Sequence, residues 1–490
     1  MMKFSEIAKK FNITVNLESE NDFEVKGLSC NSENVKEGYI FFAIKGLKNN
    51  GNKFTNDAIR NGAKIIFSEE DAKEYVPVGF HKVNQIRKLM ALVSGYFYGN
   101  PSLKLKLMGI TGTNGKTTTS YLIRSFLKDA GFKTGIIGTI GYDTGDVKMD
   151  STMTTPDSIE TNMMLGEMVN SKIDFCLMEV SSIALSMDRV YGMNFETAVF
   201  TNLTSEHLDF HHDMSNYFEA KKLLFDRLTS SAHAISNTDD EYGRIILNDT
   251  KAKKFFYSMK NESGLKAFNE RITLSGLEFE VKYKDKSYKL SSNLTGRFNI
   301  YNILASVSAV LQYDIDMNFL KESLQNFKEV DGRFNRIKLP NGAIAIIDYS
   351  HTSDSLKNAI ESAREIVSGE QQGKVITIFG CGGNKDRTKR PVMGNYATEL
   401  SDHSIITSDN PRYENPMEII KEILTGVNTK NNYEVIENRE EAISRGIEIA
   451  RSGDIVLICG KGHETYQDIG GVKSHFDDKE IVAKYLSLAK

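Results

Sequence analysis

The stretch Met108–Thr119, with the sequence MGITGTNGKTTT, constrains the fold of this chain more than any other segment. The apolar run Leu105–Ile110 predicts a buried strand, and the pattern that follows predicts a helix opening at Thr117. A strand, a glycine loop and a helix N-terminus form a phosphate site, because unpaired N–H groups and the helix dipole favour anions. We expect Lys116 to reach the outer phosphates of a nucleotide and the Thr117 hydroxyl to bind Mg²⁺.

The glycine loop differs at one position from the strict P-loop pattern G-x-x-x-x-G-K-[ST]. That pattern requires its first glycine at position 110, where this chain has Ile110. A plain strand-to-helix turn without a ligand is the alternative interpretation. The Gly-Lys-Thr sequence of residues 115–117, placed between a strand and a helix, favours the phosphate site.

The composition excludes several classes of protein. A length of 490 residues gives room for about two to four domains. The net charge of −4 does not indicate a nucleic-acid partner. The four cysteines lie far apart without metal-ligand spacing, which predicts a reducing compartment and no disulfide framework. No apolar run is long enough to cross a bilayer and the N-terminus lacks a signal-peptide core, so we expect a cytoplasmic protein with no membrane partner. We also expect a monomer, although no feature of the sequence determines the oligomeric state.

Apolar segments alternate with helical patterns in the middle of the chain, which predicts an α/β fold with a parallel sheet and helices on both faces. The predicted strands after the P-loop are Gly135–Gly138, Phe175–Val180, Thr197–Asn202 and Ala234–Asn237. Residues 272–292 alternate with a period of two and predict an antiparallel hairpin added to this sheet. Ligand residues should gather at the carboxyl ends of the parallel strands.

Two further α/β blocks flank the central one. The first begins with an amphipathic helix, Phe4–Phe11, and ends near the stop signal Gly99-Asn100-Pro101. The last alternates in the same way and is expected to be Rossmann-like. Its predicted strands are Ala343–Ile347, Val375–Phe379, Ser404–Thr407 and Asp454–Cys459. We therefore predict three domains, over residues 1–98, 99–328 and 329–490.

Glu179 ends an apolar strand that belongs to the same predicted sheet as the P-loop strand. The ends of both strands should point to one crevice, so we interpret this carboxylate as a metal or phosphate ligand. A surface charge at a strand end is the alternative. Ser181 and Ser182 open the next helix, where the ordinary role of a serine is to cap the N-terminus.

The segment Thr201–Asp213 is the densest cluster of histidine and acidic residues in the chain. His207 and His211 lie four residues apart in it, directly after a predicted strand, which favours a metal or phosphate role over a structural one. The spacing does not match that of zinc proteases and no cysteine is near, so zinc is not predicted.

Lys221 lies in the middle of an apolar stripe on the helix predicted over Tyr217–Leu228. Its neighbour Lys222 points toward Asp226 and is an ordinary solvated lysine. Burial lowers the pKa of a lysine and leaves a neutral, nucleophilic amine. Such an amine can add CO₂ and become a carbamate, in effect a long carboxylate able to bind a metal. The alternative is a lysine that extends along apolar surface to reach solvent.

The C-terminal block carries three loops that combine glycine or proline with charged residues: Gly380–Pro391, Ser408–Pro416 and Gly460–Glu464. An arginine with nearby acids suits a zwitterionic ligand, because Arg binds a carboxylate and Asp or Glu binds an ammonium group. Ordinary charged loops are the alternative. Asp348–Thr352 also follows a predicted strand, and Arg333 lies at the domain junction, from which it could swing onto a phosphate.

Taken together, these segments resemble the Mur ligases of peptidoglycan synthesis over the whole chain. The P-loop matches the family's TGTNGKTT, and other segments match its TTP, MEVSS, HLDxH, YxxAK and DNPR motifs. These segments are Thr154–Pro156, Met178–Ser182, His207–His211, Tyr217–Lys221 and Asp409–Arg412. Asn299–Asn302 is similar to the adenine-side motif of the family. The DNPR motif is associated with meso-diaminopimelate rather than L-lysine.

The resemblance implies an ATP-dependent ligase that adds meso-diaminopimelate to UDP-N-acetylmuramoyl-L-alanyl-D-glutamate through an acyl phosphate. It implies Lys116, His207 and a carbamylated Lys221 as catalytic residues. One Mg²⁺ would lie at Thr117 and Glu179, and a second at His207 and Lys221. The ATP residues would be Gly112, Thr113, Asn114, Gly115, Lys116, Thr117, Thr118, Asn299, Asn302, Arg333, Asp348 and His351.

The resemblance also implies the residues that hold the other two substrates. The nucleotide-sugar dipeptide would contact Ser32, Thr154, Thr155, Ser181 and Arg189, with the Lys45–Asn49 loop at the uridine end. The amino acid would contact Lys385, Asp409, Asn410, Arg412, Gly460 and Glu464. Its side-chain carboxylate, which lysine lacks, would pair with the Arg412 guanidinium.

The chain departs from the family pattern at four places. Asn31-Ser32-Glu33 replaces Asp-Ser-Arg, Ile183 replaces a histidine, Glu206 replaces an aspartate, and Lys385 replaces an arginine. Lys385 keeps the charge of that arginine but loses its bidentate geometry. The alternatives are therefore the same ligase acting on L-lysine or on a diaminopimelate analogue such as lanthionine, a folylpolyglutamate-type ligase, and a paralogue that binds nucleotide-sugar without turnover.

Overall fold

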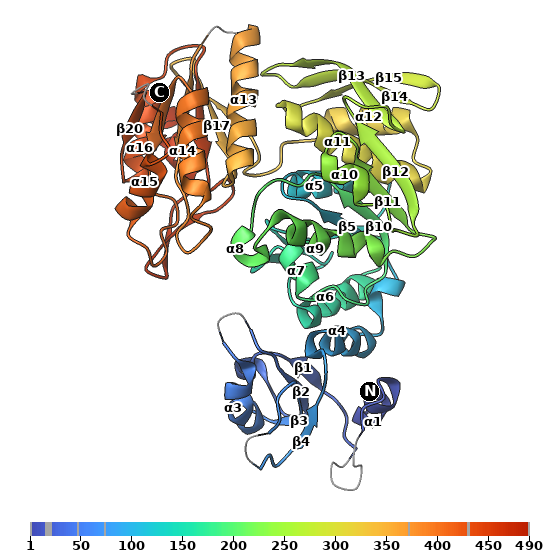
Figure 1. Ribbon diagram of the computed structural model, residues 1–490. Coiled ribbons are helices and arrows are strands. Elements are labelled where there is room, and N and C mark those ends of the chain that lie inside the picture. The colour runs from blue at the N-terminus through green and yellow to red at the C-terminus, as the bar shows by residue number, and fades with distance from the viewer. Residues whose placement is uncertain are drawn as a thin grey trace. The chain divides into compact units, whose positions relative to one another are not determined.

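The computed structural model describes residues 2–14, 22–46, 49–72, 75–370, 373–428 and 432–488. The chain divides into two compact units, one formed by Met1–Gly109 and Phe132–Glu196, the other by Ile110–Gly131 and Thr197–Lys490. Helices and strands alternate along the chain in both units (Figure 1), which confirms the predicted α/β fold.

The first sheet of unit 1 has four parallel strands in the order β1-β2-β3-β4. They are β1 (Gly27–Ser29), β2 (Tyr39–Ala43), β3 (Ala63–Ser68) and β4 (Gly79–Lys82). Ile40 and Phe42 of β2 face a core that includes α1 (Phe4–Lys10) and α4 (Ile86–Phe97), and Phe41 faces α3 (Thr55–Arg60). Both faces of the sheet are therefore buried, as expected for parallel strands covered by helices.

The remaining strands of unit 1 lie in the order β5-β9-β6-β7-β8. Their bounds are β5 (Lys106–Thr111), β6 (Thr134–Ile137), β7 (Gly141–Asp143), β8 (Lys148–Asp150) and β9 (Phe175–Glu179). β6 and β9 are parallel, whereas β6-β7-β8 forms an antiparallel extension. This extension was not predicted, because β8 is exposed throughout and carries no apolar run. Unit 1 also contains α6 (Ser158–Asn170) and α7 (Ser182–Ser186).

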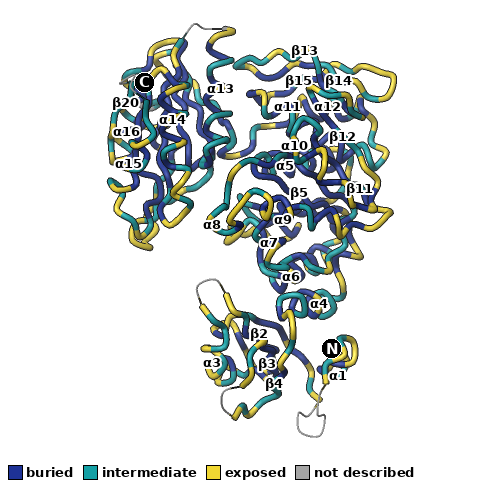
Figure 2. Tube along the Cα trace, viewed as in Figure 1, coloured by how far each residue is buried: buried dark blue, intermediate teal, exposed yellow. Residues whose placement is uncertain are grey.

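In unit 2, four parallel strands follow in chain order and an antiparallel pair extends them. They are β10 (Phe195–Phe200), β11 (His233–Asn237), β12 (Lys253–Ser258), β13 (Leu265–Ile272), β14 (Leu277–Tyr283) and β15 (Lys286–Ser292). The predicted hairpin is confirmed as β14-β15. The helices here are α5 (Lys116–Asp129), α8 (Leu208–His211), α9 (Met214–Asp226), α10 (Glu241–Ile245), α11 (Arg297–Val310) and α12 (Met317–Asn326). Almost every residue of α11 is buried (Figure 2).

The C-terminal sheet has the order β16-β17-β21-β18-β19-β20, and only β16 among its described strands runs antiparallel to its neighbour. Its strands are β16 (Asn335–Lys338), β17 (Ile344–Asp348), β18 (Val375–Phe379), β19 (His403–Ile406), β20 (Tyr433–Val435) and β21 (Ile455–Cys459). Its helices are α13 (Ser353–Glu370), α14 (Lys389–Leu400), α15 (Pro416–Leu424), α16 (Arg439–Ile449) and α17 (Asp478–Leu488). The hairpin β22 (Tyr466–Ile469) and β23 (Val472–His475) follows β21.

Alternate residues of this sheet enter two separate cores. Ile346 and Leu457 pack with α13, α14 and α15, and Ile347 and Ile458 pack with α16 and α17. The paired register of β17 with β21 and of β18 with β19 brings their carboxyl ends to one edge. The loops expected to bind ligands leave the sheet at that edge, as predicted for parallel strands.

The cysteines and the lengths of the helices were also predicted from the sequence. All four cysteines are free, as predicted. Within the ranges that the structure describes, no helix combines the length and the apolar composition that a bilayer crossing requires.

We expect Ile378→Ala to lower the stability of the C-terminal sheet, because Ile378 is fully buried in the core beneath α16. Loss of a buried isoleucine side chain costs about 2–5 kcal/mol. The matched control is Ile469→Ala, at a side chain that is 54% exposed, which should change stability by less than about 0.5 kcal/mol. Thermal unfolding of both variants measures this, and equal midpoints would contradict the assignment of the core.

Candidate active site

The glycine loop joins β5 to α5 with the geometry of a phosphate site. Gly112 and Gly115 have φ values of +150° and +86°, which L side chains rarely adopt. A Cβ at Gly115 would lie 2.3 Å from the Asn302 amide oxygen, so the loop has no room for a side chain there. The helix α5 begins at Lys116, directly after the loop, and Thr117 and Thr118 lie buried in its first turn. The N-terminus of a helix favours anions, because its N–H groups point out of the helix toward the ligand.

Lys116 folds back over this loop. Its amine donates hydrogen bonds to the carbonyl oxygens of Gly112 at 2.9 Å and Thr113 at 2.8 Å. The amine therefore lies at the mouth of the glycine loop, where a phosphate would be bound.

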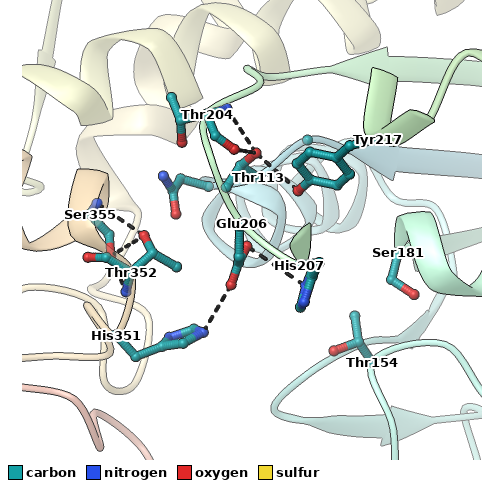
Figure 3. A network of polar contacts seen from close by, with 12 residues as sticks. Thr113, Thr154, Ser181, Thr204, Glu206, His207, Tyr217, His351, Thr352 and Ser355 are labelled. Carbon is teal, nitrogen blue, oxygen red and sulfur yellow. Dashed lines mark hydrogen bonds and ion pairs between the residues drawn. The ribbon is translucent and has the colours of Figure 1, made fainter. Parts of the chain in front are cut away.

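Thr113 connects the loop to two other elements, as Figure 3 shows. Its hydroxyl donates to the Thr204 carbonyl at 3.1 Å and accepts from the Thr204 N–H at 3.0 Å. The same hydroxyl lies 3.1 Å from the Tyr217 hydroxyl of α9. Nearby, Asn114 donates through its side-chain amide to the Asp354 carboxylate of α13 at 2.9 Å. The loop is thus held by the segment after β10, by α9 and by α13.

Lys221 is buried on α9, as its position in the apolar stripe predicted, with 1% of its surface exposed. Its amine donates to the Gly112 carbonyl at 3.0 Å and lies 4.6 Å from the centre of the Tyr217 ring. Burial lowers the pKa of Lys221 well below its ordinary value, and the nearby charge of Lys116 lowers it further. Lys222 instead forms ion pairs with acidic side chains at the surface, as predicted.

Glu206 lies between two histidines (Figure 3). Its carboxylate is 3.8 Å from the His207 ring nitrogen and 3.3 Å from that of His351, which follows β17. Burial raises the pKa of Glu206, but the neighbouring His207, His351 and Lys116 lower it overall. Burial lowers the pKa of His207, and it lowers the pKa of His211 to about 4. His207 of the HLDxH segment therefore lies beside the Glu206 carboxylate, which stays ionised.

Arg333 reaches the first turn of α5. Its guanidinium donates to the Thr117 hydroxyl at 3.0 Å and lies 4.4 Å from the centre of the Tyr349 ring. Its Nε is buried without a hydrogen-bond partner in the described structure. Asp348, by contrast, holds the backbone: its carboxylate accepts from the N–H groups of Phe334 at 2.8 Å and Ser350 at 2.9 Å.

Two asparagines of α11 lie beneath the glycine loop. The Asn302 amide donates to Asn299 at 2.9 Å, and Asn299 donates to the Thr295 carbonyl at 2.7 Å. Both asparagines are buried, and Asn302 closes the space above Gly115.

Glu179 ends β9 in unit 1 and is fully buried. Its carboxylate accepts from the Thr139 N–H and hydroxyl, both at 3.0 Å. Thr139 also lies 3.1 Å from the Thr154 hydroxyl. The sequence did not identify Thr139, which follows the turn after β6 without a recognisable motif.

The other residues predicted to hold the nucleotide-sugar dipeptide also belong to unit 1. Thr155 donates to the Glu179 carbonyl at 2.8 Å and accepts from the Ser181 N–H at 3.0 Å. Arg189 donates to the Thr155 carbonyl at 2.8 Å. Ser181 caps α7, as predicted. The structure thus brings these three residues together with Glu179.

The residues expected at the uridine end lie in the N-terminal sheet region. Ser32 opens a short 3-10 helix, Ser32–Asn34, and its carbonyl accepts from the Asn61 side chain at 2.9 Å. The predicted contribution of the Lys45–Asn49 loop cannot be followed through residues 47 and 48, which lie outside the described ranges.

The loops after β19 and β21 form a buried polar network. Asn410 donates to the Glu464 carboxylate at 2.8 Å and accepts from the Lys461 amine at 3.1 Å. One carboxylate oxygen of Asp409 is buried without a hydrogen-bond partner in the described structure. A Cβ at Gly460 would lie 2.4 Å from that oxygen. Lys461 has a fully buried side chain and was not predicted, because a lysine between two glycines has no sequence signal of burial.

Arg412 is held in an unusual conformation, with φ of +53°. Its guanidinium donates to the Gly383 carbonyl at 2.9 Å, and its N–H donates to the Asp468 carbonyl of the β22 hairpin at 2.9 Å. Burial lowers the pKa of Lys385, and the charge of Arg412 adds to that effect. Two cationic side chains therefore face the same region of the C-terminal edge.

No three His, Cys, Asp or Glu side chains of the described residues converge on a point where they could hold a metal ion by themselves. A metal at this site would therefore need other donors, such as hydroxyl groups or phosphate oxygens.

Comparisons with known proteins identify each part of the chain. Residues 24–98 match the description "Mur ligase family, catalytic domain", residues 110–310 "Mur ligase middle domain", and residues 332–462 "Mur ligase, glutamate ligase domain".

The relatives and the solved structures agree with these matches. The chain is 42% identical to UDP-N-acetylmuramoyl-L-alanyl-D-glutamate–2,6-diaminopimelate ligase 1 of Clostridium acetobutylicum, over 94% of this chain and 95% of the relative. It is 41% identical to the corresponding ligase of Clostridium tetani over 99% of both chains. A solved structure of a ligase of the same name is 29% identical, with a TM-score of 0.67, and covers 97% of this chain and 99% of its own. The chain belongs to the Mur ligase family.

Proposed function

We propose that this chain joins meso-diaminopimelate to the D-glutamate carboxylate of UDP-N-acetylmuramoyl-L-alanyl-D-glutamate, using ATP. The observation that carries the proposal is identity above 40% over nearly the full length to relatives named for this reaction. The buried lysine, the glycine loop and the Arg412 loop supply the chemistry that this reaction needs.

The first step activates a poor electrophile. An oxygen of the glutamate carboxylate attacks the γ-phosphorus of ATP, and the bond from this phosphorus to the bridging oxygen breaks. ADP is released, and the carboxylate has become an acyl phosphate. In our proposal the glycine loop and Lys116 hold the phosphates, because N–H groups and a cation stabilise the charge of the transferring group. The position of the Lys116 amine at the mouth of the loop supports this role.

The second step forms the amide. The neutral amine attacks the acyl carbon, phosphate leaves, and the nitrogen loses a proton. We assign the binding of the amino acid to the Asp409–Arg412 loop, Gly460, Glu464 and Lys385. The guanidinium of Arg412 suits the side-chain carboxylate, and Lys385 adds positive charge beside it. Diaminopimelate carries that carboxylate and L-lysine does not.

In the proposal, Lys221 carries a carbamate. Its neutral amine would attack CO₂, form an N–C bond and release a proton, which leaves a carbamate anion in place of the amine. The burial of the amine and its lowered pKa support this reaction. The adjacent Lys116 would stabilise the new negative charge.

The donors His207 and Lys221 fit Mg²⁺ only after this reaction, because Mg²⁺ prefers oxygen ligands and an amine offers none. Thr117 and Glu179 would hold one ion, and His207 and the carbamate of Lys221 a second. Bound Mg²⁺ would supply positive charge to the phosphate oxygens. Arg333 would add positive charge near the phosphates, and Asn299, Asn302, Asp348 and His351 would shape the nucleotide pocket.

The nucleotide-sugar dipeptide would be held by residues of unit 1: Ser32, Thr154, Thr155, Ser181 and Arg189. The hydrogen bonds of Thr155 with Ser181, Arg189 and the Glu179 carbonyl support this assignment, since they order part of the site before the substrate binds.

Phosphate release with ATP, UDP-N-acetylmuramoyl-L-alanyl-D-glutamate and a panel of amino acids distinguishes the alternatives. Release that depends on meso-diaminopimelate supports the proposal. Release with L-lysine or lanthionine instead would show that the enzyme adds a different amino acid. Release with a folylpolyglutamate-type substrate would show that it catalyses a different ligation. If no amino acid stimulates phosphate release, the remaining hypothesis is a paralogue that binds nucleotide-sugar without turnover.

We expect Lys221→Ala to lower kcat by about 10²-fold or more, because it removes the carbamate that would hold the second Mg²⁺ and with it the positive charge near the phosphate oxygens. Lys222→Ala, at the neighbouring surface lysine, is the matched control and should keep kcat within about twofold. ¹³C NMR of the wild type in [¹³C]bicarbonate should show one carbamate signal that Lys221→Ala lacks. A fully active Lys221→Ala enzyme would refute the role of this lysine.

Arg412→Leu should raise KM for meso-diaminopimelate by about 10- to 100-fold, because a hydrogen bond to a charged group contributes about 1.5–3 kcal/mol. KM for ATP should stay unchanged. Arg387→Leu, at an exposed arginine paired with Glu422, is the control and should behave as the wild type. Equal KM values for Arg412→Leu and the wild type would exclude Arg412 from the amino-acid site.

A further inference from the structure

An ion pair lies buried beneath the loops assigned to the amino acid. Arg439, the first residue of α16, and Asp478, the first residue of α17, both have fully buried side chains. Their contact is bidentate: Nε donates to one carboxylate oxygen at 2.8 Å and Nη2 to the other at 2.7 Å. The pair therefore fixes the guanidinium in one orientation.

The remaining donors of Arg439 reach both loops. Nη2 donates to the Cys459 carbonyl at 3.0 Å, directly before Gly460. Nη1 lies 3.5 Å from the Ser408 carbonyl, directly before Asp409. One guanidinium thus connects the ends of β19 and β21 with the start of the C-terminal helix.

Asp409 is the acidic residue that this guanidinium faces. One of its carboxylate oxygens accepts from the Asn410 N–H at 2.6 Å, and the other is buried without a partner in the described structure. That open oxygen lies against Gly460, where any Cβ would collide with it. A buried carboxylate oxygen without a donor is costly, unless a nearby cation or a bound ligand compensates.

The guanidinium of Arg439 lies near two carboxylates, those of Asp478 and Asp409. Although burial lowers the pKa of Arg439, the charges of Asp478 and Asp409 raise it overall, so the guanidinium stays protonated. Because Asp478 forms the bidentate pair with Arg439, the open oxygen of Asp409 remains available to another donor. An ammonium group of the incoming amino acid has the matching charge and three donors.

We propose that Arg439, oriented by Asp478, is a positioning residue for the amino-acid site: it fixes the Asp409 and Gly460 loops so that the open oxygen of Asp409 can accept from a substrate ammonium group. This inference rests on the proposed function. It extends the amino-acid site to α17, an element that carries none of the motif residues.

Steady-state kinetics of the double variant Arg439→Met/Asp478→Leu tests the proposal. Removing both partners avoids a lone buried charge, and such replacements commonly preserve the fold. We expect KM for meso-diaminopimelate to rise about tenfold or more, while KM for ATP and for the nucleotide-sugar dipeptide stays within about twofold. Arg439→Lys, which keeps the charge, should recover part of the loss that Arg439→Met shows.

Arg445→Met is the matched control, since Arg445 lies on the same helix and pairs with Glu434 at the surface. It should behave as the wild type. Should the double variant not fold, as judged by circular dichroism, Asp478→Asn provides the same comparison with a smaller perturbation.

Two results would overturn the proposal. In a folded variant, an unchanged KM for meso-diaminopimelate would show that the pair does not position the site. An equal rise of all three KM values would show a general structural role. A wild type without amino-acid-dependent phosphate release would instead contradict the proposed function, so the two failures are distinguishable.

Discussion

Two lysine amines share one carbonyl oxygen, that of Gly112, and the rest of the central site depends on this arrangement. Lys116 and Lys221 donate to it at 2.9 and 3.0 Å. Two ammonium groups so close together in a buried site would repel each other strongly. Burial and the charge of Lys116 both lower the pKa of Lys221. In our proposal Lys116 is therefore the cation for phosphate and Lys221 the amine that adds CO₂. The repulsion between the two amines adds to the burial of Lys221, and both effects support the division of roles that we propose.

Much of this arrangement could be predicted from the sequence, because it depends on periodicity and spacing. The 3.6-residue period was sufficient to predict that Lys221 is buried and that Lys222 pairs with Asp226. The alternation of apolar strands and helices was sufficient to predict parallel sheets with ligand loops at their carboxyl ends. The hairpin of β14 and β15 was evident from its period of two. These signals are local, so the sequence carries them directly.

What could not be predicted involves partners far apart in the chain. Asp354 binds Asn114 across 240 residues, and Asp478 binds Arg439 across 39. Neither contact follows from the character of its own segment. Lys461 is fully buried although its neighbours are glycines, and the exposed strand β8 has no apolar pattern. The structure was needed wherever burial came from tertiary packing and not from a local pattern.

Lys116 and Arg333 already have hydrogen bonds to the protein in the places where phosphate oxygens are expected to bind. The Lys116 amine is bound to two carbonyl oxygens of its own loop, and Arg333 to the Thr117 hydroxyl. Nucleotide binding at this loop therefore replaces existing hydrogen bonds within the protein by hydrogen bonds to phosphate oxygens. The measured affinity reports a difference between two sets of hydrogen bonds. A substitution that weakens the internal set could tighten nucleotide binding while it removes the order that holds the empty loop in shape.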